Sequence, residues 1–211
     1  MNPNRLLTVA GLTFLLSFSG CATTKKATDA RKLKTGSDFG YFNGPIETRW
    51  DDDGLNMTVL KELRYTDPDG VVWVAPTGAK VNGASIPRAF WSLIGGPFDG
   101  KYRKASVLHD VAYDEKSRPW QEVDRMFYNA MRCAGVGPAE AKTMYYSVYR
   151  FGHHWKFKSK RARAVAGGSI SESETRPSAV NPSDVNAIEH WIEQSNPGLN
   201  EIEARASDDE R

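Results

Sequence analysis

Hydrophobic and polar positions alternate in two stretches early in the chain. Leu55, Met57 and Val59 are separated by polar residues, and the alternation resumes at Leu63. A two-residue period places the apolar side chains on one face of a strand, which can then pack on a core. The pattern predicts β-strands over residues 40–82.

A turn separates this alternation from a second apolar segment. Asp67-Pro68-Asp69-Gly70 combines a proline with preset φ and a glycine that tolerates positive φ, and Val71-Val72-Trp73-Val74 follows it. This order predicts a β-hairpin. Thr77-Gly78 and Asn82-Gly83 mark further turns, so we expect a third short strand around Lys80-Val81.

The period changes to that of a helix after residue 85. Ser85-Ile86-Pro87 is typical of an N-cap with proline in the first turn, which predicts a short helix through Trp91. Apolar residues spaced three and four apart predict longer helices over 102–115, from 119 to about 134, and from 139 to about 155. A small antiparallel sheet followed by three or four helices is an α+β fold.

Composition and charge set the limits of the domain. The chain has 211 residues, 40% of them hydrophobic, as in ordinary globular proteins, and a net charge of +2 gives no reason to expect a nucleic-acid partner. We expect one globular α+β domain over residues 40–160. Residues 161–211 are rich in Ser, Glu, Asn, Asp and Pro, which predicts a largely disordered tail with one short helix near Val185 and Ile192.

The first twenty residues have the three parts of an export signal. A single positive charge precedes an apolar stretch from Leu6 to Phe18, and small residues follow it up to Cys21. The apolar run is too short to span a bilayer comfortably but fits the core of a signal peptide. We therefore expect residues 1–20 to be a signal peptide and residues 21–39, which are polar, to be a flexible tether.

The end of this signal, Phe18-Ser19-Gly20-Cys21, resembles the bacterial lipoprotein box, in which the cysteine receives a diacylglyceryl group before cleavage. The resemblance implies that Cys21 becomes the lipidated N-terminus, and two or three acyl chains anchor a protein stably to a membrane. Ala22 is not the Asp that signals inner-membrane retention, which favours the outer membrane, facing the periplasm. The expected partners are the membrane, through Cys21, and in addition a phospholipid or an envelope protein. A plain signal peptide cut elsewhere, or a short membrane anchor, is the alternative.

A histidine and an aspartate stand at matching distances from the break between two predicted helices. His109 and Tyr113 are four residues apart and share a helix face, while Asp124 lies in the next helix. Both His109 and Asp124 lie roughly 8 Å from the turn, at 1.5 Å per residue. An antiparallel pair therefore brings the carboxylate opposite the imidazole, where it can accept the ring N–H and raise the basicity of the ring. This arrangement of a base and an orienting residue can activate water.

A glycine-rich loop at residues 95–100 precedes this helix pair. The loop, His109-Asp110-x-x-Tyr113 and Asp124 together resemble secreted phospholipase A2 enzymes, especially their minimal viral forms. The resemblance implies that His109 is the general base, that Asp110 binds calcium together with loop carbonyls, that Asp124 orients His109, and that Tyr113 supports the network. The loop lacks the usual Tyr-x-Gly-x-Gly form of that family.

A second resemblance covers most of residues 40–155. The segments Asn82-Gly83-Ala84-Ser85-Ile86-Pro87-Arg88, Leu108-His109-Asp110 and Asp124-x-x-Phe127 look like an uncharacterised family of phages and bacteria, catalogued as domain of unknown function 1353. The resemblance implies a common fold and a phage or prophage association, but no activity. That family usually has Asp where Asn82 stands in this chain.

Other interpretations of these residues stay open. His-Asp pairs also mark metal-dependent phosphohydrolases, for which His153-His154 would supply further ligands. A buried polar network that holds the helices to the hairpin is the structural alternative, because buried polar groups must pair. Its supporting members would be Tyr113, Arg88, Ser85 and Asn82. The first functional hypothesis is therefore a lipid-anchored lipid or ester hydrolase of phage type, and the second is a non-enzymatic envelope module, for example one that interferes with phage entry.

Overall fold

The computed structural model describes residues 37–83, 85, 87–91, 95–96, 98–156 and 181–208, all of which fall in one unit, Gly36–Arg211. The predicted signal peptide, Cys21 and nearly all of the predicted tether lie outside the described residues.

Short strands form two antiparallel sheets of three strands each. The first sheet has the order β1-β4-β5, with β1 at Tyr41–Phe42, β4 at Leu63–Thr66 and β5 at Val72–Ala75. The second has the order β2-β3-β6, with β2 at Thr48–Trp50, β3 at Met57–Val59 and β6 at Lys80–Val81. The predicted strands, the hairpin and the short strand around residue 80 are confirmed.

The turn between β4 and β5 is held by one aspartate. Asp67 Oδ1 accepts the backbone N–H groups of Asp69 at 3.0 Å and Val71 at 2.8 Å, and its Oδ2 accepts the indole N–H of Trp73 at 3.0 Å. Gly70 has a φ of 82°, which few other residues adopt at low cost. These contacts fix the register that pairs Tyr65 with Trp73 across the hairpin.

The alternation predicted to begin at Leu55 begins two residues later. Met57 and Val59 are buried, whereas the Leu55 side chain is 68% exposed. Leu55 lies in a turn, where its backbone N–H and that of Asn56 both donate to Asp53 Oδ1 at 2.8 Å. The turn uses the N–H groups locally, so β3 starts only after it.

Three long helices follow the sheets. They are α3 (Arg103–Glu115), α4 (Trp120–Cys133) and α5 (Pro138–Phe151), and a short 3-10 helix, η1 (Arg88–Phe90), precedes them. The third predicted helix ends at Phe151 rather than near residue 155, because the backbone turns extended at Gly152. The fold is α+β, as predicted.

The C-terminal segment departs from its prediction. Instead of one short helix in a disordered tail, it contains α7 (Pro182–Ser195) and α8 (Leu199–Asp208), both of which pack on α5. Their buried residues join the hydrophobic core of the domain and are Val185, Ile188, Ile192, Ile202 and Ala206. The packed domain therefore does not end at residue 160.

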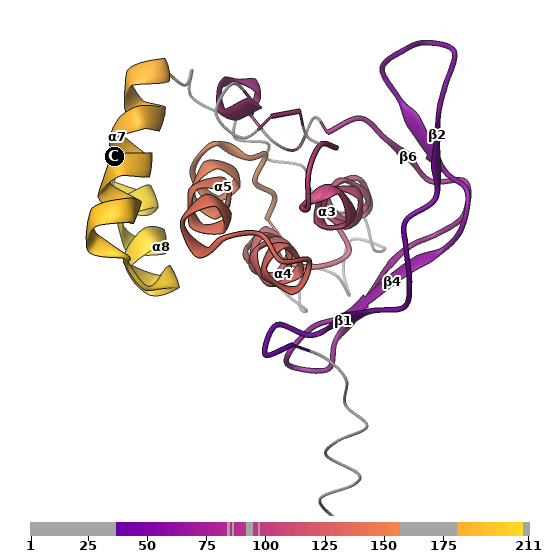
Figure 1. Ribbon diagram of the computed structural model, residues 1–211, viewed down its shortest axis with the longest axis horizontal. Helices are drawn as coiled ribbons and strands as arrows, with labels where there is room; N and C mark the ends of the chain where they lie inside the picture. Colours follow the sequence, from indigo (N-terminus) through magenta and orange to yellow (C-terminus); the bar gives the residue numbers. More distant parts are fainter. Residues whose placement is uncertain are drawn as a thin grey trace, which may run out of the picture. The chain divides into compact units, whose positions relative to one another are not determined.

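The helices and sheets are arranged around the α3–α4 pair. Figure 1 shows the strands beside α3 and α4, and α7 and α8 on the far side of α5. Within the part of the chain that the structure describes, no helix is both long and apolar enough to cross a bilayer.

Candidate functional site

A histidine and an aspartate pair across the α3–α4 interface. His109 Nε2 lies 2.9 Å from Asp124 Oδ1, as the spacing from the turn predicted. A carboxylate can only accept, so the bond that joins the two residues uses a proton on Nε2, and Nδ1 is the ring nitrogen that Asp124 does not contact.

The pair is enclosed by protein. His109 and Asp124 are both 0% exposed. The imidazole ring lies between the rings of Tyr113 and Phe127, with centroid separations of 4.2 and 4.6 Å. Water therefore does not reach the imidazole directly.

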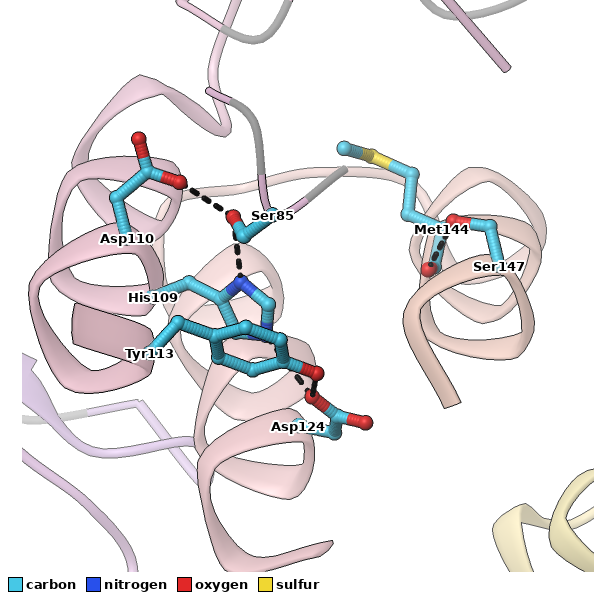
Figure 2. Close-up of polar contacts among 7 residues, drawn as sticks. All are labelled: Ser85, His109, Asp110, Tyr113, Asp124, Met144 and Ser147. Atoms are coloured by element: carbon cyan, nitrogen blue, oxygen red, sulfur yellow. Dashed lines mark hydrogen bonds and ion pairs between the residues drawn. The ribbon is translucent and has the colours of Figure 1, made fainter. Parts of the chain in front are cut away.

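Tyr113 is the second donor to this aspartate. Its hydroxyl donates to Asp124 Oδ1 at 2.7 Å (Figure 2). Burial, followed by the charge of Asp124, raises the pKa of Tyr113 well above its ordinary value, so the phenol stays protonated and remains a donor. Asp124 Oδ2 is buried and has no hydrogen-bond partner among the described residues. A buried carboxylate oxygen without a donor costs stability, which makes this network an expensive way to join two helices.

The other ring nitrogen faces a serine. His109 Nδ1 lies 3.0 Å from Ser85 Oγ, and the Ser85 hydroxyl also donates to Asp110 Oδ1 (Figure 2). The sequence predicted Ser85 as a helix N-cap, which is wrong: η1 has Pro87 at that position and no side-chain cap. The Ser85 hydroxyl is used instead to join α3 to the loop after β6.

Asp110 is held by this same loop. Its Oδ2 accepts the backbone N–H groups of Asn82 at 3.0 Å and Gly83 at 2.5 Å. Asn82 thus joins the network through its backbone N–H, and the residue as a whole is exposed. Ser85, His109, Asp110, Tyr113 and Asp124, all predicted from sequence, are brought together.

A cavity of about 220 Å³ opens beside the network. Ser85, Asp110 and Tyr113 line it, whereas His109 and Asp124 do not. Its remaining charged or titratable lining comes from Lys80, Asp114, Lys116 and His153. Sequence reasoning did not assign Asp114 to the site, although Asp114 follows Asp110 by one helical turn and so shares its face. Burial, and then the charge of Asp110, raises the pKa of Asp114.

The residues do not fit the implied calcium ion. Asp110 directs its oxygens at N–H and O–H donors, whereas calcium needs several oxygen ligands around it. The glycine-rich loop borders a different cavity, of about 490 Å³, with Gly96 and Asp99 in its wall. Within the loop, the Gly96 carbonyl accepts the Tyr102 hydroxyl at 2.8 Å.

Arg88 does not join the network, in contrast to its prediction. Its guanidinium lies 5.6 Å from the centroid of the Trp91 ring, and Arg88 lines the second cavity. The side chain that was predicted to join the network is thus near Trp91, which the local sequence could not reveal.

The phosphohydrolase interpretation gains little support. His153 lines the first cavity, but His154 stacks on Trp120 with a centroid separation of 3.6 Å. In the ranges that the structure describes, no three His, Cys, Asp or Glu side chains are grouped to hold a metal ion.

The fold and the site thus define an α+β domain in which a buried Ser–His–Asp chain reaches a small polar cavity. Residues 57–148 match a family described as "Protein of unknown function (DUF1353)". This match supports the second resemblance, and it covers η1, α3, α4 and most of α5.

Two curated relatives come from Sinorhizobium fredii (strain NBRC 101917 / NGR234). "Uncharacterized protein y4jT" is 44% identical over 124 residues, which are 58% of this chain and 37% of that protein. "Uncharacterized protein y4iH" is 30% identical over 162 residues, which are 77% of this chain and 65% of that protein. The chain therefore spans less than two thirds of either relative. No solved structure matches it.

Proposed function

We propose that this protein is a hydrolase that cleaves an ester bond, with His109 as its general base. The observation that carries the proposal is the orientation of one ring: Nε2 is held by Asp124 at 2.9 Å, and Nδ1 is directed at Ser85, which lines a cavity. An imidazole that is oriented by a carboxylate and can accept a proton at its other nitrogen is the usual base of acyl transfer.

The test is hydrolysis by the purified full chain. Phospholipid vesicles and soluble p-nitrophenyl esters are incubated with wild type, His109→Ala and the control His190→Ala, with calcium or with a chelator. His190 is exposed on α7, so its loss leaves the site intact. We expect turnover by wild type and the control, and a fall of about 10³-fold or more for His109→Ala. Equal turnover by wild type and His109→Ala would remove His109 from the mechanism.

A non-enzymatic envelope module is the second candidate, and the complete burial of His109 and Asp124 favours it. In that role the network only joins α3, α4 and the loop after β6. Such a module predicts no hydrolysis by wild type, and a lower unfolding temperature for His109→Ala as the sole effect.

We further propose that the domain is lipid-anchored in the bacterial envelope through Cys21. The apolar run that ends at Phe18-Ser19-Gly20-Cys21 supports this proposal. Metabolic labelling with palmitate is expected to mark wild type and to fail for Cys21→Ser. Membrane fractionation is expected to place the labelled protein in the outer membrane, since Ala22 follows the cysteine. Unlabelled, freely soluble wild type would contradict the anchor.

The phage or prophage association that the sequence resemblance implies suggests two settings for the anchored domain. As a hydrolase it would lie beside acyl substrates, and as a binding module beside the envelope proteins that phages use for entry. Infection efficiency in cells with wild type or His109→Ala separates the two. If wild type and His109→Ala reduce phage infection equally, the binding module is favoured.

A further inference from the structure

We propose that Ser85 is the nucleophile of this site and that hydrolysis passes through an acyl-Ser85 intermediate without calcium. This inference rests on the proposed ester hydrolase activity and names the atom that attacks the substrate.

Of the three residues Ser85, His109 and Asp124, Ser85 is the one that a ligand in the cavity can contact. His109 and Asp124 are fully buried, whereas Ser85 lies on the wall of the 220 Å³ cavity. Ser85 Oγ also lies 3.0 Å from His109 Nδ1, on the only ring nitrogen that Asp124 leaves available. A water molecule activated by His109 would need the position that Ser85 Oγ holds. The hydroxyl itself is therefore the group that the base can activate.

The phospholipase resemblance assigns Asp110 to a cation, but in this structure hydrogen-bond donors compensate the charge of its carboxylate. Two backbone N–H groups, from Asn82 and Gly83, donate to its Oδ2. The positive ends of these N–H dipoles point at the carboxylate, so they compensate its charge and would repel a cation bound there. Asp110 is thus a positioning residue that holds the loop carrying Ser85 against α3.

The number of protons on Ser85 and His109 limits which hydrogen bonds the Ser85 hydroxyl can make. Three links join Asp110, Ser85, His109 and Asp124 in a row, and a neutral His109 with Ser85 supplies two protons for them. Nε2–H donates to Asp124 Oδ1, and the Ser85 hydroxyl donates to Asp110 Oδ1, from which it turns toward His109 Nδ1 for attack. The form with the proton directed at Nδ1 is ready for attack.

The reaction balances with water as the only co-substrate. Ser85 Oγ forms a bond to the ester carbonyl carbon while its proton moves to His109 Nδ1. The bond from that carbon to the leaving oxygen then breaks, and the leaving alcohol takes the proton from Nδ1. In the acyl form Ser85 Oγ no longer bonds to Nδ1 and turns away with the acyl group, so a water molecule from the cavity takes that place. This water attacks the acyl carbon and gives a proton to Nδ1. The bond to Ser85 Oγ breaks, and the serine takes that proton back.

The experiment uses an alkyl fluorophosphonate on the full chain with a calcium chelator present. Attack by Ser85 Oγ forms a bond to phosphorus and releases fluoride, and the adduct stays in place. Trypsin is expected to release residues 81–88, between Lys80 and Ala89, and Ser85 is the sole serine in that peptide. An adduct on it is therefore assigned without ambiguity by mass spectrometry.

We expect labelling of wild type and of the control Ser183→Ala, whose serine is exposed on α7. Labelling is expected to fall at least about 100-fold in Ser85→Ala and in His109→Ala. Ser85→Cys keeps the size of the side chain, so it separates loss of the nucleophile from loss of the fold. Its fold is checked by circular dichroism, and the thiol is expected to react with iodoacetamide at the same peptide.

Each other result has a distinct meaning when ester turnover is measured in parallel. Turnover without an adduct, retained in Ser85→Ala and lost in His109→Ala, means that water is the nucleophile. It overturns this inference and leaves the proposed function intact. An adduct without turnover of the chosen esters supports Ser85 and narrows the substrate. Neither adduct nor turnover ends both proposals, and labelling that requires added calcium overturns the calcium-independent site.

Discussion

Two of the helix interfaces in this domain differ in what lies at their centre. Between α3 and α4, an imidazole and a carboxylate lie at the centre of the contact, both fully buried. Between α5 and the C-terminal helices the centre is apolar, with Ile192 and Ile202 at 1% and 0% exposure. Both interfaces hold helices together, so packing alone does not require the polar one.

The charged groups at the C-terminal interface are paired or hydrogen-bonded, and the ion pair is partly exposed. Arg125 pairs with Glu203, and their side chains are 44% and 24% exposed. Lys142, whose pKa is lowered by burial and then by Arg132, donates to Asn196 at 2.6 Å. Buried ion pairs are often no more stabilising than apolar residues of the same size. The α3–α4 network therefore points to a role other than stability.

The largest effect is expected for Asp124→Asn, which tests whether the polar α3–α4 interface has a catalytic role. The amide cannot hold the Nε2 proton as the carboxylate does, so the ring loses its tautomer. We expect ester turnover to fall by about 10³- to 10⁴-fold, as loss of this carboxylate does in Ser–His–Asp hydrolases. The control is Asp184→Asn, whose residue is exposed on α7 and whose loss should leave kcat/KM unchanged. Turnover of Asp124→Asn within a few-fold of wild type would make the buried pair purely structural.

The apolar interface is broken by Ile202→Ala. This residue is 0% exposed, and its truncation leaves a cavity between α8 and the core. We expect the free energy of unfolding in urea to fall by about 2–5 kcal/mol, with kcat/KM unchanged in the folded protein. The control Leu55→Ala, at a side chain that is 68% exposed, should change the free energy of unfolding by less than about 0.5 kcal/mol. An unchanged stability for Ile202→Ala would mean that α8 is not part of the folded core.

Gly152→Ala tests whether the two regions depend on the end of α5. A Cβ there would lie 2.4 Å from the Val148 carbonyl oxygen and 2.7 Å from the Tyr113 hydroxyl. We expect a loss of about 1–3 kcal/mol in thermal or urea unfolding, together with reduced turnover, because Tyr113 must move from Asp124. Gly44→Ala, where no described atom lies within 4 Å of the added Cβ, should leave both quantities unchanged. A normal stability in Gly152→Ala would show that the end of α5 yields easily.

The smallest effect is expected at the edge of the cavity. The pKa of Asp114 is raised by burial and then by Asp110, so the unfolded chain loses this proton at a lower pH than the folded one. Stability therefore falls as pH rises from the ordinary Asp value through the folded value, and the loss persists at neutral pH. Asp114→Asn should remove this loss and gain up to about 0.5 kcal/mol at pH 7, with no gain near pH 3. A gain at pH 3 that equals the gain at pH 7 would contradict this cause, and urea unfolding at both values measures it.

Local patterns predicted the paired helices because the geometry there is local. His109 and Asp124 are 15 residues apart and joined by a short turn, so the helical rise alone places them level. The strands were predicted for a similar reason, since the Asp67 turn fixes the hairpin between an alternating segment and a continuous apolar one. Asp114 could have been assigned to the site from its spacing to Asp110.

The role of Ser85 could not be predicted in this way. Ser85 and His109 are 24 residues apart, and the pattern around Ser85 is equally typical of a helix cap. The same limit applies to Arg88, which the sequence grouped with the network and the structure places beside Trp91. The tail was misjudged because its polar composition masks the apolar positions of α8, Ile202 and Ala206, which are buried in the core.

The sequence by itself determined the elements: short strands, an antiparallel helix pair and a histidine placed level with an aspartate, all of which follow from periodicity and chain connectivity. Only the tertiary structure decided which loop reaches the free nitrogen of that histidine, which residues face the cavity and which are sealed from water. These outcomes depend on contacts between segments that are distant along the chain, and such contacts leave no local pattern.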